Sequence, residues 1–293
     1  MKNILLTGAT GFLGSYVLKA LINDYNVIIL KRSFSDTWRI EKIINKVKFY
    51  DIDKTAINKI FDENKIDVIA HTAVEYGNGK SADEINKVNI ELPIALLESG
   101  IRKGLKCFIN TDTFFNRDDI KYTHLLDYSL SKKHLLEKLK KYAGKTQILN
   151  MRMEHIYGPL DRKNKFVVNI IHRILSNELS IDMTPGSQKR DFLFIEDAAL
   201  AFKLVLDNIS KIKENYIEFG IGRGVSNSIK EFIEIVLKIT KSKSKINFGA
   251  LTYRDGEIMD SRADTKALKA LTGWAPETSI KDGLMKTIEY MKL

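Results

Sequence analysis

Cysteine, histidine and long apolar runs are scarce in this sequence. Its 293 residues include a single cysteine, Cys107, and five scattered histidines. One cysteine excludes an intramolecular disulfide framework and favours a reducing compartment, and these few residues offer no metal-ligand cluster. No apolar run reaches the roughly 18 to 20 residues needed to cross a bilayer. We therefore expect a soluble, cytoplasmic protein with no bound metal and no membrane partner.

The amino terminus and the net charge each allow more than one interpretation. The opening MKNILLTGATGFLG places a lysine before apolar residues, as a signal peptide does, but the apolar stretch is short and broken by glycines, which favours a first strand. The net charge of +10 is compatible with nucleic acid, a membrane surface or a small anionic ligand. Most of the excess is dispersed lysine, and the densest cluster, residues 132–145, carries leucines at helical spacing, as a solvated helix face does. We expect no nucleic-acid partner.

Apolar runs and helical patterns alternate along the first part of the chain. Such alternation predicts an α/β fold with a doubly wound parallel sheet of the Rossmann type. After Gly158-Pro159 the alternation ends, which predicts a smaller, mostly C-terminal α+β part. We expect a first domain at residues 1–158, rejoined by about 188–212, and a second part at residues 159–293, with a ligand cleft between them. The predicted strands of the first domain are residues 4–6, 26–30, 47–50, 68–71, 107–110 and 148–151, with a helix at 81–97 among those between them.

Three glycines stand between the first predicted strand and the first predicted helix, in the sequence GATGFLG at residues 8–14. Glycines allow a tight turn and let backbone N–H groups approach a pyrophosphate, whose charge also favours the positive end of the helix dipole. Glycine-rich turns also join strands to helices without any ligand, but the surrounding strand–helix–strand pattern favours a dinucleotide site. The expected contacts are Gly8, Thr10, Gly11, Phe12, Leu13 and Gly14.

The end of the second predicted strand discriminates between two nicotinamide cofactors. An acidic residue there would bind the adenosine ribose hydroxyls of NAD, whereas basic residues would pair with the 2′-phosphate of NADP. The chain has Lys31-Arg32-Ser33 and no carboxylate at this place. We therefore predict NADP(H), held in part by Lys31 and Arg32, although the alternative that both are ordinary solvated loop residues stays open.

Tyr128 and Lys132 stand one helical turn apart, so both side chains are expected on the same helix face. An ammonium group beside a phenol favours phenolate and lowers the phenol pKa from about 10 toward neutrality. The tyrosine could then give or take the proton that accompanies hydride transfer at a carbonyl. Such a pair is common by chance on surface helices, but together with the glycine loop, in this chain order, it indicates a dehydrogenase site.

Over essentially its whole length the chain resembles the extended short-chain dehydrogenase/reductase family, the nucleotide-sugar epimerases, dehydratases and ketoreductases. The glycine loop and the Tyr128/Lys132 pair carry the resemblance in the first half. The segment 110–115 is similar to the one that holds the family's third catalytic hydroxyl, which implies that Thr111 donates a hydrogen bond to the substrate carbonyl oxygen. The resemblance further implies cofactor contacts from Asp51, Ile52, Thr72, Ala73, Val74, Asn89, Tyr128 and Lys132, with Asn89 bracing the site.

The second half resembles the family's substrate-binding part. Residues 152–159 are similar to the strand and turn that open this part, with His155 in place of the family's usual asparagine. Arg190 and Arg254 lie in segments similar to substrate-binding loops and are interpreted as a clamp on a diphosphate, because forked guanidinium groups suit this task. The alternative is that both are ordinary surface arginines. The implied substrate contacts are Glu75, Thr111, Asp112, Thr113, His155, Lys165, Phe166, Arg190, Arg254 and Glu257.

Within the family the chain looks most like the CDP-abequose and CDP-paratose synthases, in residues 74–77, 110–112 and 151–159. This resemblance implies NADPH-dependent reduction of the 4-keto group of a nucleotide-linked deoxyhexose, for O-antigen and lipopolysaccharide synthesis. The sugar would be a CDP-4-keto-3,6-dideoxyhexose or a dTDP- or GDP-linked 4-keto-6-deoxyhexose. Family dehydratases follow the catalytic threonine with Asp and Glu, whereas Thr111 is followed by Asp112 and Thr113, which argues against dehydration.

Three further expectations follow. A nucleotide-sugar epimerase that retains NAD is the alternative enzyme, although Lys31 and Arg32 fit it poorly. A non-catalytic NADP(H)-sensing regulator is the alternative of another class, against which the set of Thr111, Tyr128 and Lys132 argues. The resemblance also implies a homodimer with the helices of Asn89 and Tyr128 at its two-fold axis, unless the leucine-rich faces around 90–97 and 135–139 are buried inside one subunit.

Overall fold

The computed structural model describes residues 1–77, 79–117 and 125–292. Seven parallel strands form the central sheet, in the order β11-β6-β5-β4-β1-β2-β3. Most of its inner strands are nearly continuous apolar runs, and Ile4, Leu5 and Leu6 are fully buried, as expected where helices cover both faces of a parallel sheet. The strands are β1 (Asn3–Thr7), β2 (Asn26–Lys31), β3 (Lys48–Asp51), β4 (Val68–His71), β5 (Cys107–Thr113), β6 (Gln147–Met153) and β11 (Tyr216–Ile221).

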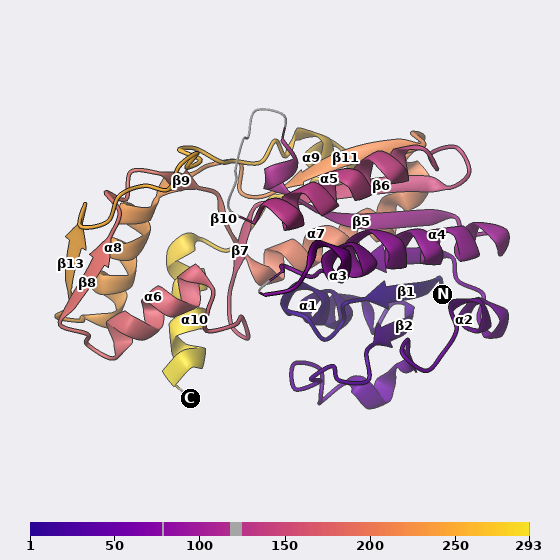
Figure 1. The fold of residues 1–293 in the computed structure, drawn as a ribbon, viewed down its shortest axis with the longest axis horizontal. Coiled ribbons are helices and arrows are strands. Elements are labelled where there is room, and N and C mark those ends of the chain that lie inside the picture. Colours follow the sequence, from indigo (N-terminus) through magenta and orange to yellow (C-terminus); the bar gives the residue numbers. More distant parts are fainter. Residues whose placement is uncertain (78, 118–124, 293) are drawn as a thin grey trace.

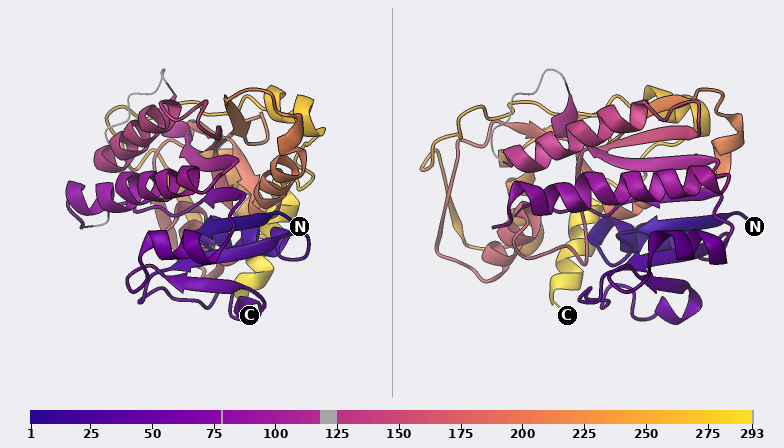
Figure 2. Two further views of the ribbon diagram at one scale, coloured as in Figure 1. Left: turned by 90° about the vertical axis from the view of Figure 1, so that its right-hand side faces the viewer. Right: turned by 45° about the vertical axis from the view of Figure 1, so that its right-hand side comes forward.

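Helices cover both faces of this sheet, which confirms the doubly wound architecture (Figure 1). One core cluster joins the sheet to α1 (Phe12–Leu21) and α7 (Ile195–Asn208), and a second joins it to α2 (Ile57–Glu63), α4 (Leu92–Arg102) and α5 (Leu126–Lys140). The left view of Figure 2 shows the sheet between these two layers. The helix α9 (Lys266–Thr272) packs against α7 and β11 at the edge of the sheet.

The second part of the chain lies beyond the carboxyl ends of the strands (Figure 1). Its core is continuous with the α1–α7 side of the sheet, because Phe192 stacks on Phe232 at a ring-centroid distance of 4.0 Å within the same apolar cluster. Its helices are α6 (Phe166–Leu175), α8 (Ile229–Thr240) and α10 (Ile280–Lys292). Its strands pair as β7 (His155–Tyr157) with β10 (Phe192–Phe194), β8 (Ser180–Met183) with β13 (Lys245–Phe248), and β9 (Lys189–Arg190) with β12 (Asn227–Ser228).

The chain returns to the central sheet through α7 and β11. The helix falls inside the expected returning segment, 188–212, and β11 is the next strand along the chain and pairs in parallel with β6. The expected division into two domains stays a prediction, but the sheet itself draws on residues up to Ile221.

The expected helix at 81–97 is interrupted by a π-helical turn. It consists of α3 (Ala82–Asn86), the π turn at Lys87–Glu91 and α4. A π turn inserts one extra residue into a helix, which turns the following side chains to new directions and is frequent at functional sites. Here it contains Asn89. The short 3-10 helices are η1 (Ile44–Lys46), η3 (Phe114–Asn116) and η4 (Ile209–Lys211).

No helix among the described residues is long and apolar enough to cross a membrane. The leucines expected at a dimer interface are buried inside the subunit instead, since Leu96, Leu97, Leu135 and Leu139 are each 0% exposed. The homodimer stays a prediction, and these four residues no longer support it.

Candidate active site

The glycine loop brings two stretches of backbone into contact. Gly8 has a φ of 72°, in the left-handed region, and a Cβ there would lie 2.5 Å from the backbone nitrogen of Ala73. A Cβ on Gly14 would lie 2.1 Å from the carbonyl oxygen of Gly8. The N–H group of Gly11 donates to that same carbonyl at 2.8 Å. Side chains at Gly8 or Gly14 would therefore push α1 away from β1 and β4. Glycine at both positions allows this close approach.

The first turn of α1 suits an anionic group. Its N-cap is Gly11, no side chain caps it, and no acidic residue occupies its first turn. The N–H groups at this end thus have no side-chain acceptor, and the helix dipole favours negative charge there. Together with the tight Gly8–Gly14 approach, these residues fit the pyrophosphate of a dinucleotide.

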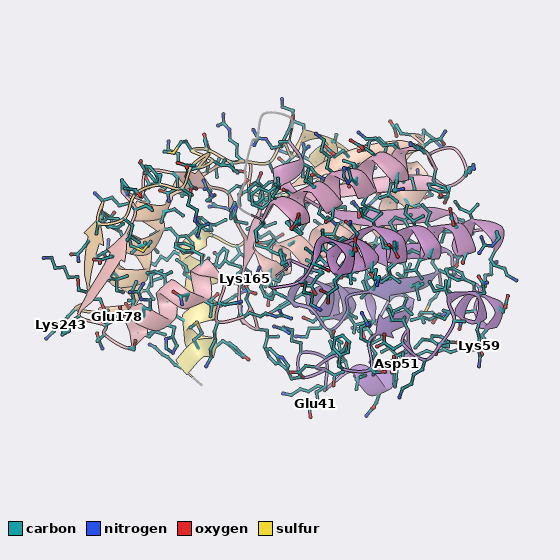
Figure 3. All side chains as sticks on the ribbon, in the orientation of Figure 1. Glu41, Asp51, Lys59, Lys165, Glu178 and Lys243 are labelled. Carbon is teal, nitrogen blue, oxygen red and sulfur yellow. The ribbon has the colours of Figure 1, made fainter. Side chains whose placement is uncertain are left out.

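The residues expected at the adenosine ribose gather at the end of β2 and β3. The Nε atom of Arg32 lies 2.6 Å from Oδ1 of Asp53, and the hydroxyl of Ser33 donates to Asp51 at 2.6 Å. Lys31 pairs with Asp51 in strand register. This corner therefore holds two cations beside two carboxylates, a mixture that the sequence around Lys31 alone did not reveal. Figure 3 labels Asp51 in this corner of the molecule.

The segment after β4 runs along the glycine loop. The hydroxyl of Thr72 donates to the carbonyl of Thr7 at 2.7 Å, and the N–H of Ala73 donates to the Thr7 hydroxyl at 3.2 Å. The same hydroxyl shares a hydrogen bond of 2.8 Å with Nδ1 of His71. Burial, and to a lesser extent the charge of Lys132, lowers the pKa of His71 to about 3, so its imidazole is neutral. These contacts place Thr72 and Ala73, with Val74 next in the chain, against the expected cofactor site.

Asn89 forms hydrogen bonds through both ends of its amide. Its oxygen accepts from the N–H of Glu75 at 2.8 Å, and its nitrogen donates to the carbonyl of Glu75 and to the hydroxyl of Ser131, each at 2.9 Å. The Ser131 hydroxyl in turn donates to the carbonyl of Tyr128 at 2.7 Å. Asn89 thereby ties the segment after β4 to the helix that carries Tyr128. These bonds define a bracing role and leave direct cofactor contact a prediction.

Thr111, Tyr128 and Lys132 converge where β5 meets α5. Tyr128 and Lys132 are 6% and 3% exposed. The Lys132 ammonium donates to the main-chain carbonyl of Thr111, and the Tyr128 hydroxyl is hydrogen-bonded to the side chain of Thr113. The hydroxyl of Thr111 is buried and has no hydrogen-bond partner among the described residues. A buried hydroxyl without a partner has its donor available for a substrate carbonyl.

The expected lowering of the Tyr128 pKa is wrong for this structure. Burial raises the pKa of Tyr128, and the neighbouring Tyr76 and Asp112 raise it further, against the hydrogen bond to Thr113, which lowers it. Burial also lowers the pKa of Lys132, which Asp112 partly offsets. The groups that shift the pKa of Tyr128 are Tyr76, Thr113 and Asp112, while the Lys132 ammonium binds the Thr111 carbonyl.

Asp112 lies in a polar cluster on the α5 face of the sheet. Its carboxylate accepts from the amide of Asn150 at 2.9 Å and from that of Asn116 at 2.7 Å. Asn150 also donates to Glu218 at 2.9 Å, and Glu218 pairs with Arg152 at 2.7 Å. Burial raises the pKa of Asp112. Its carboxylate is thus bound to protein amides, and its expected contact with substrate stays a prediction.

Two aromatic residues that were not singled out from the sequence pack on Tyr128. The ring centroid of Tyr76 lies 4.9 Å from that of Tyr128, and Phe115 meets Tyr128 edge-on at 6.4 Å. The Lys165 ammonium lies 3.7 Å from the centre of the Tyr76 ring. Both aromatics could have been predicted from their positions, because Tyr76 and Phe115 each follow closely a segment that was expected at the site. Figure 3 labels Lys165 where the second part of the chain meets the sheet.

His155 lies in an aromatic setting. Its ring stacks near Phe114 at 4.4 Å and meets Phe192 at 6.1 Å. Burial lowers its pKa, while the adjacent Glu154, whose carboxylate is 3.7 Å from Nδ1, raises it. Phe166, the first residue of α6, is 41% exposed, so its ring is accessible in the second part.

Arg190 and Glu257, both expected at the substrate, bind each other. Their ion pair is buried, with side chains 10% and 13% exposed, and the Arg190 guanidinium also donates to the carbonyl of Ile258. The N–H of Glu257 donates to the carbonyl of Arg254 at 3.1 Å, so these two residues belong to one turn. A clamp by both arginines would require Arg190 to exchange its carboxylate partner for a diphosphate, and it stays a prediction. Glu75 lies 3.9 Å from the ammonium of Lys80.

A pocket of about 520 Å³ at the ends of β6 and β11 contains none of the expected site residues. Four of its lining residues are basic and two are acidic, so basic side chains predominate. It is lined by Arg117, Arg152, Glu154, Gly220, Gly224, Arg262, Ala263, Asp264 and Lys266. No group of three or more His, Cys, Asp or Glu residues within the described ranges could hold a metal ion.

A model of the NAD dependent epimerase/dehydratase family matches residues 4–222. The chain belongs to this family. Two CDP-abequose synthases are among its relatives in the family, which confirms the resemblance seen in the motifs. The one from Salmonella muenchen is 37% identical and covers 98% of this chain and 97% of its own length. The one from Salmonella typhimurium is 34% identical and covers 98% of each.

Solved family structures have the same fold. UDP-glucuronic acid 4-epimerase from Bacillus cereus, in complex with UDP-glucuronic acid and NAD, aligns over 99% of both chains with a TM-score of 0.81 and 26% identity. UDP-glucose 4-epimerase from Thermotoga maritima, with UDP-glucose, aligns over 99% of this chain and 98% of its own with a TM-score of 0.85 and 24% identity. The Rossmann-type sheet and the smaller second part are therefore shared family features.

Proposed function

We propose that this family member reduces the 4-keto group of a nucleotide-linked deoxyhexose, using NADPH. The observation that carries the proposal is that Lys132 binds the Thr111 backbone, with Tyr128 buried on the same helix, beside a cradle for a dinucleotide. Similarity to two CDP-abequose synthases at 37% and 34% identity supports a CDP-4-keto-3,6-dideoxyhexose as the first substrate to test. A dTDP- or GDP-linked 4-keto-6-deoxyhexose is the alternative, and the product would serve O-antigen synthesis.

The glycine loop, with the first turn of α1, would hold the pyrophosphate, and Lys31 and Arg32 the 2′-phosphate. Lys132 and the segment at Thr72 and Ala73 would contact the nicotinamide end. A bound reduced nicotinamide supplies the hydride that the carbonyl carbon receives. The remaining chemistry belongs to the residues of the chain.

Tyr128 is the proposed proton donor. As the carbonyl carbon is reduced, negative charge develops on O4, and the Tyr128 hydroxyl transfers its proton to that oxygen, leaving an alcohol and a phenolate that solvent reprotonates. Burial keeps the phenol neutral beforehand, which suits a donor in the reductive direction. The unpaired hydroxyl of Thr111 would donate a hydrogen bond to the same oxygen and stabilise its charge.

The decisive experiment offers NADPH and a panel of CDP-, dTDP- and GDP-linked 4-keto sugars to the purified protein. Loss of absorbance at 340 nm, together with a gain of two mass units in the sugar nucleotide, is the expected result for one linkage class. Failure of every 4-keto sugar in the panel to consume NADPH would reject the proposal.

A second candidate is an epimerase that retains NAD. The carboxylates of Asp51 and Asp53 beside Arg32 favour it, because they offer acceptors for ribose hydroxyls. The purified protein would then carry bound NAD(H) and interconvert C4 epimers without consuming added cofactor.

A further inference from the structure

Tyr76 occupies a position between the two parts of the chain that the proposed chemistry does not yet use. Its ring packs on the Tyr128 ring at 4.9 Å, with an angle of 31° between the two planes. The Lys165 ammonium lies 3.7 Å from the centre of the same ring. The Tyr76 ring therefore contacts both Tyr128 and Lys165. The resulting stack joins the segment after β4, the helix α5 and the N-cap of α6.

The helix turn that carries Tyr128 depends on such contacts. The N-cap residue of α5 is Leu125, which has a left-handed φ of 65° and provides no side-chain cap. A helix end without a capping side chain is held less firmly by its own sequence. The Tyr128 side chain is fixed instead by the Tyr76 ring, the Phe115 edge and the Thr113 hydroxyl.

The backbone next to Tyr76 is held in place by hydrogen bonds. Both backbone groups of the preceding residue, Glu75, bond to Asn89, and Asn89 reaches the Tyr128 carbonyl through Ser131. The main chains of the two tyrosines are therefore linked by hydrogen bonds while their rings are in contact. A ring on so short and fixed a support has little freedom to leave Tyr128 through backbone motion alone.

We propose that Tyr76 is a positioning residue for Tyr128: its ring holds the phenol in place for proton transfer and, through Lys165, connects that placement with the second part of the chain. Aromatic pairs and cation–ring contacts of this kind are attractive and favour particular geometries, so they restrict the orientation of a side chain. The kinetic test of this proposal rests on the proposed function, because it needs a substrate. The spectroscopic test rests on the geometry alone. The titratable groups facing the stack are Tyr76, Lys132, Asp112, Asp161, Arg162 and Lys165.

Tyr76→Ala removes the ring, and Tyr76→Phe, the matched control, removes the hydroxyl alone. We expect Tyr76→Ala to lower kcat about 10- to 100-fold through misplacement of the phenol, with KM for NADPH within about twofold of the wild-type value. Tyr76→Phe should keep kcat within about threefold. Because the exposed phenol would ionise more easily, the alkaline limb of the kcat profile should move to lower pH in Tyr76→Ala. A wild-type kcat and an unmoved limb in a folded Tyr76→Ala protein would overturn the proposal.

The phenol of Tyr128 can also be titrated without any substrate, by the absorbance of phenolate near 295 nm after subtraction of the same protein carrying Tyr128→Phe. Tyr76→Ala should lower the pKa of this phenol, and Tyr76→Phe should leave it nearly unchanged. This measurement stands even if no 4-keto sugar is reduced, so it distinguishes failure of the positioning role from failure of the proposed function. An unchanged phenol pKa in Tyr76→Ala would reject the role.

Lys165→Met tests the connection with the second part of the chain in a double-mutant cycle. At saturating substrate it should lower kcat in the wild-type background and have a smaller effect when Tyr76→Ala is already present. An equal effect in both backgrounds would contradict the connection through Lys165.

Discussion

The ammonium group of Lys132 donates its hydrogen bond to the main-chain carbonyl of Thr111. This contact joins α5 to the end of β5, where the Tyr128 hydroxyl is hydrogen-bonded to the side chain of Thr113. The pKa of Tyr128 responds instead to burial, Tyr76, Thr113 and Asp112. Burial leaves that phenol neutral. A neutral Tyr128 phenol, and a Thr111 hydroxyl without a partner in the described parts of the chain, fit the reduction of a carbonyl better than the removal of a proton from an alcohol.

Tyr128→Phe should reduce turnover by about 10²-fold or more while substrate binding is kept, the size expected for loss of a positioned general acid. His155→Gln is the comparison, since an imidazole is the nearest alternative donor but here lies among Phe114 and Phe192. Both variants are measured at saturating NADPH and substrate. Turnover abolished by His155→Gln and retained by Tyr128→Phe would reverse the assignment.

Thr111→Val replaces the hydroxyl with a methyl group of similar size. The loss of one hydrogen bond to the developing charge on the carbonyl oxygen should cost about 10²-fold in kcat, as for single oxyanion donors. Thr111→Ser keeps the donor and should keep most of the activity. Equal losses in the two variants would assign Thr111 a packing role only.

NADPH should bind more tightly than NADH, and replacing Lys31 by Asp together with Arg32 by Ala should reverse this order. The structure adds a second variant: Asp53→Asn removes the carboxylate that pairs with Arg32 and should strengthen NADPH binding. Dissociation constants follow from titration of protein fluorescence with each cofactor. Equal affinity of the wild-type protein for NADH and NADPH would contradict the role of the 2′-phosphate.

Gly14→Ala should weaken cofactor binding and lower stability, because its Cβ would lie 2.1 Å from the Gly8 carbonyl. Overpacking of this kind costs about 1–3 kcal/mol. Gly11→Ala is the matched control, since its Cβ would meet the same carbonyl only at 3.1 Å. Thermal unfolding with and without NADPH compares the two, and a larger loss in Gly11→Ala would count against the close approach at Gly14.

The carboxylate of Asp191 predicts a pH-dependent contribution to stability. It accepts hydrogen bonds from the N–H groups of Arg223, Gly224 and Ala263, yet burial raises its pKa from 3.8 to about 6. The folded state therefore holds this proton more tightly, so the contribution is fully present below about pH 4 and is lost as the pH rises through 6. The stability of the wild-type protein relative to Asp191→Asn should fall by about 2–3 kcal/mol between pH 4 and 7. Urea unfolding at several pH values measures it, and a constant or rising difference would contradict the raised pKa.

Local sequence rules were enough for the parallel sheet and the glycine loop. Apolar runs at 4–6, 26–30 and 68–71 became β1, β2 and β4 with boundaries within one residue. Strands buried on both faces need continuous apolar residues. Gly8 and Gly14 lie so close to backbone atoms that only glycine fits. Both features can therefore be predicted from the residue types alone. The predicted strand at 107–110 was too short, because polar residues follow it in the sequence. β5 continues to Thr113, since β6 supplies backbone partners over that length.

The sequence singled out Tyr128 and Lys132 by their helical spacing, and the family resemblance added Thr111, as the residues expected to carry the chemistry. Only the tertiary structure decided what these groups bind. It directed Lys132 to a carbonyl oxygen, paired Arg190 with Glu257 and placed Tyr76 on Tyr128. The physical reason is that spacing fixes the direction of a side chain on its own helix or strand, whereas burial and hydrogen bonding depend on partners from distant segments of the chain.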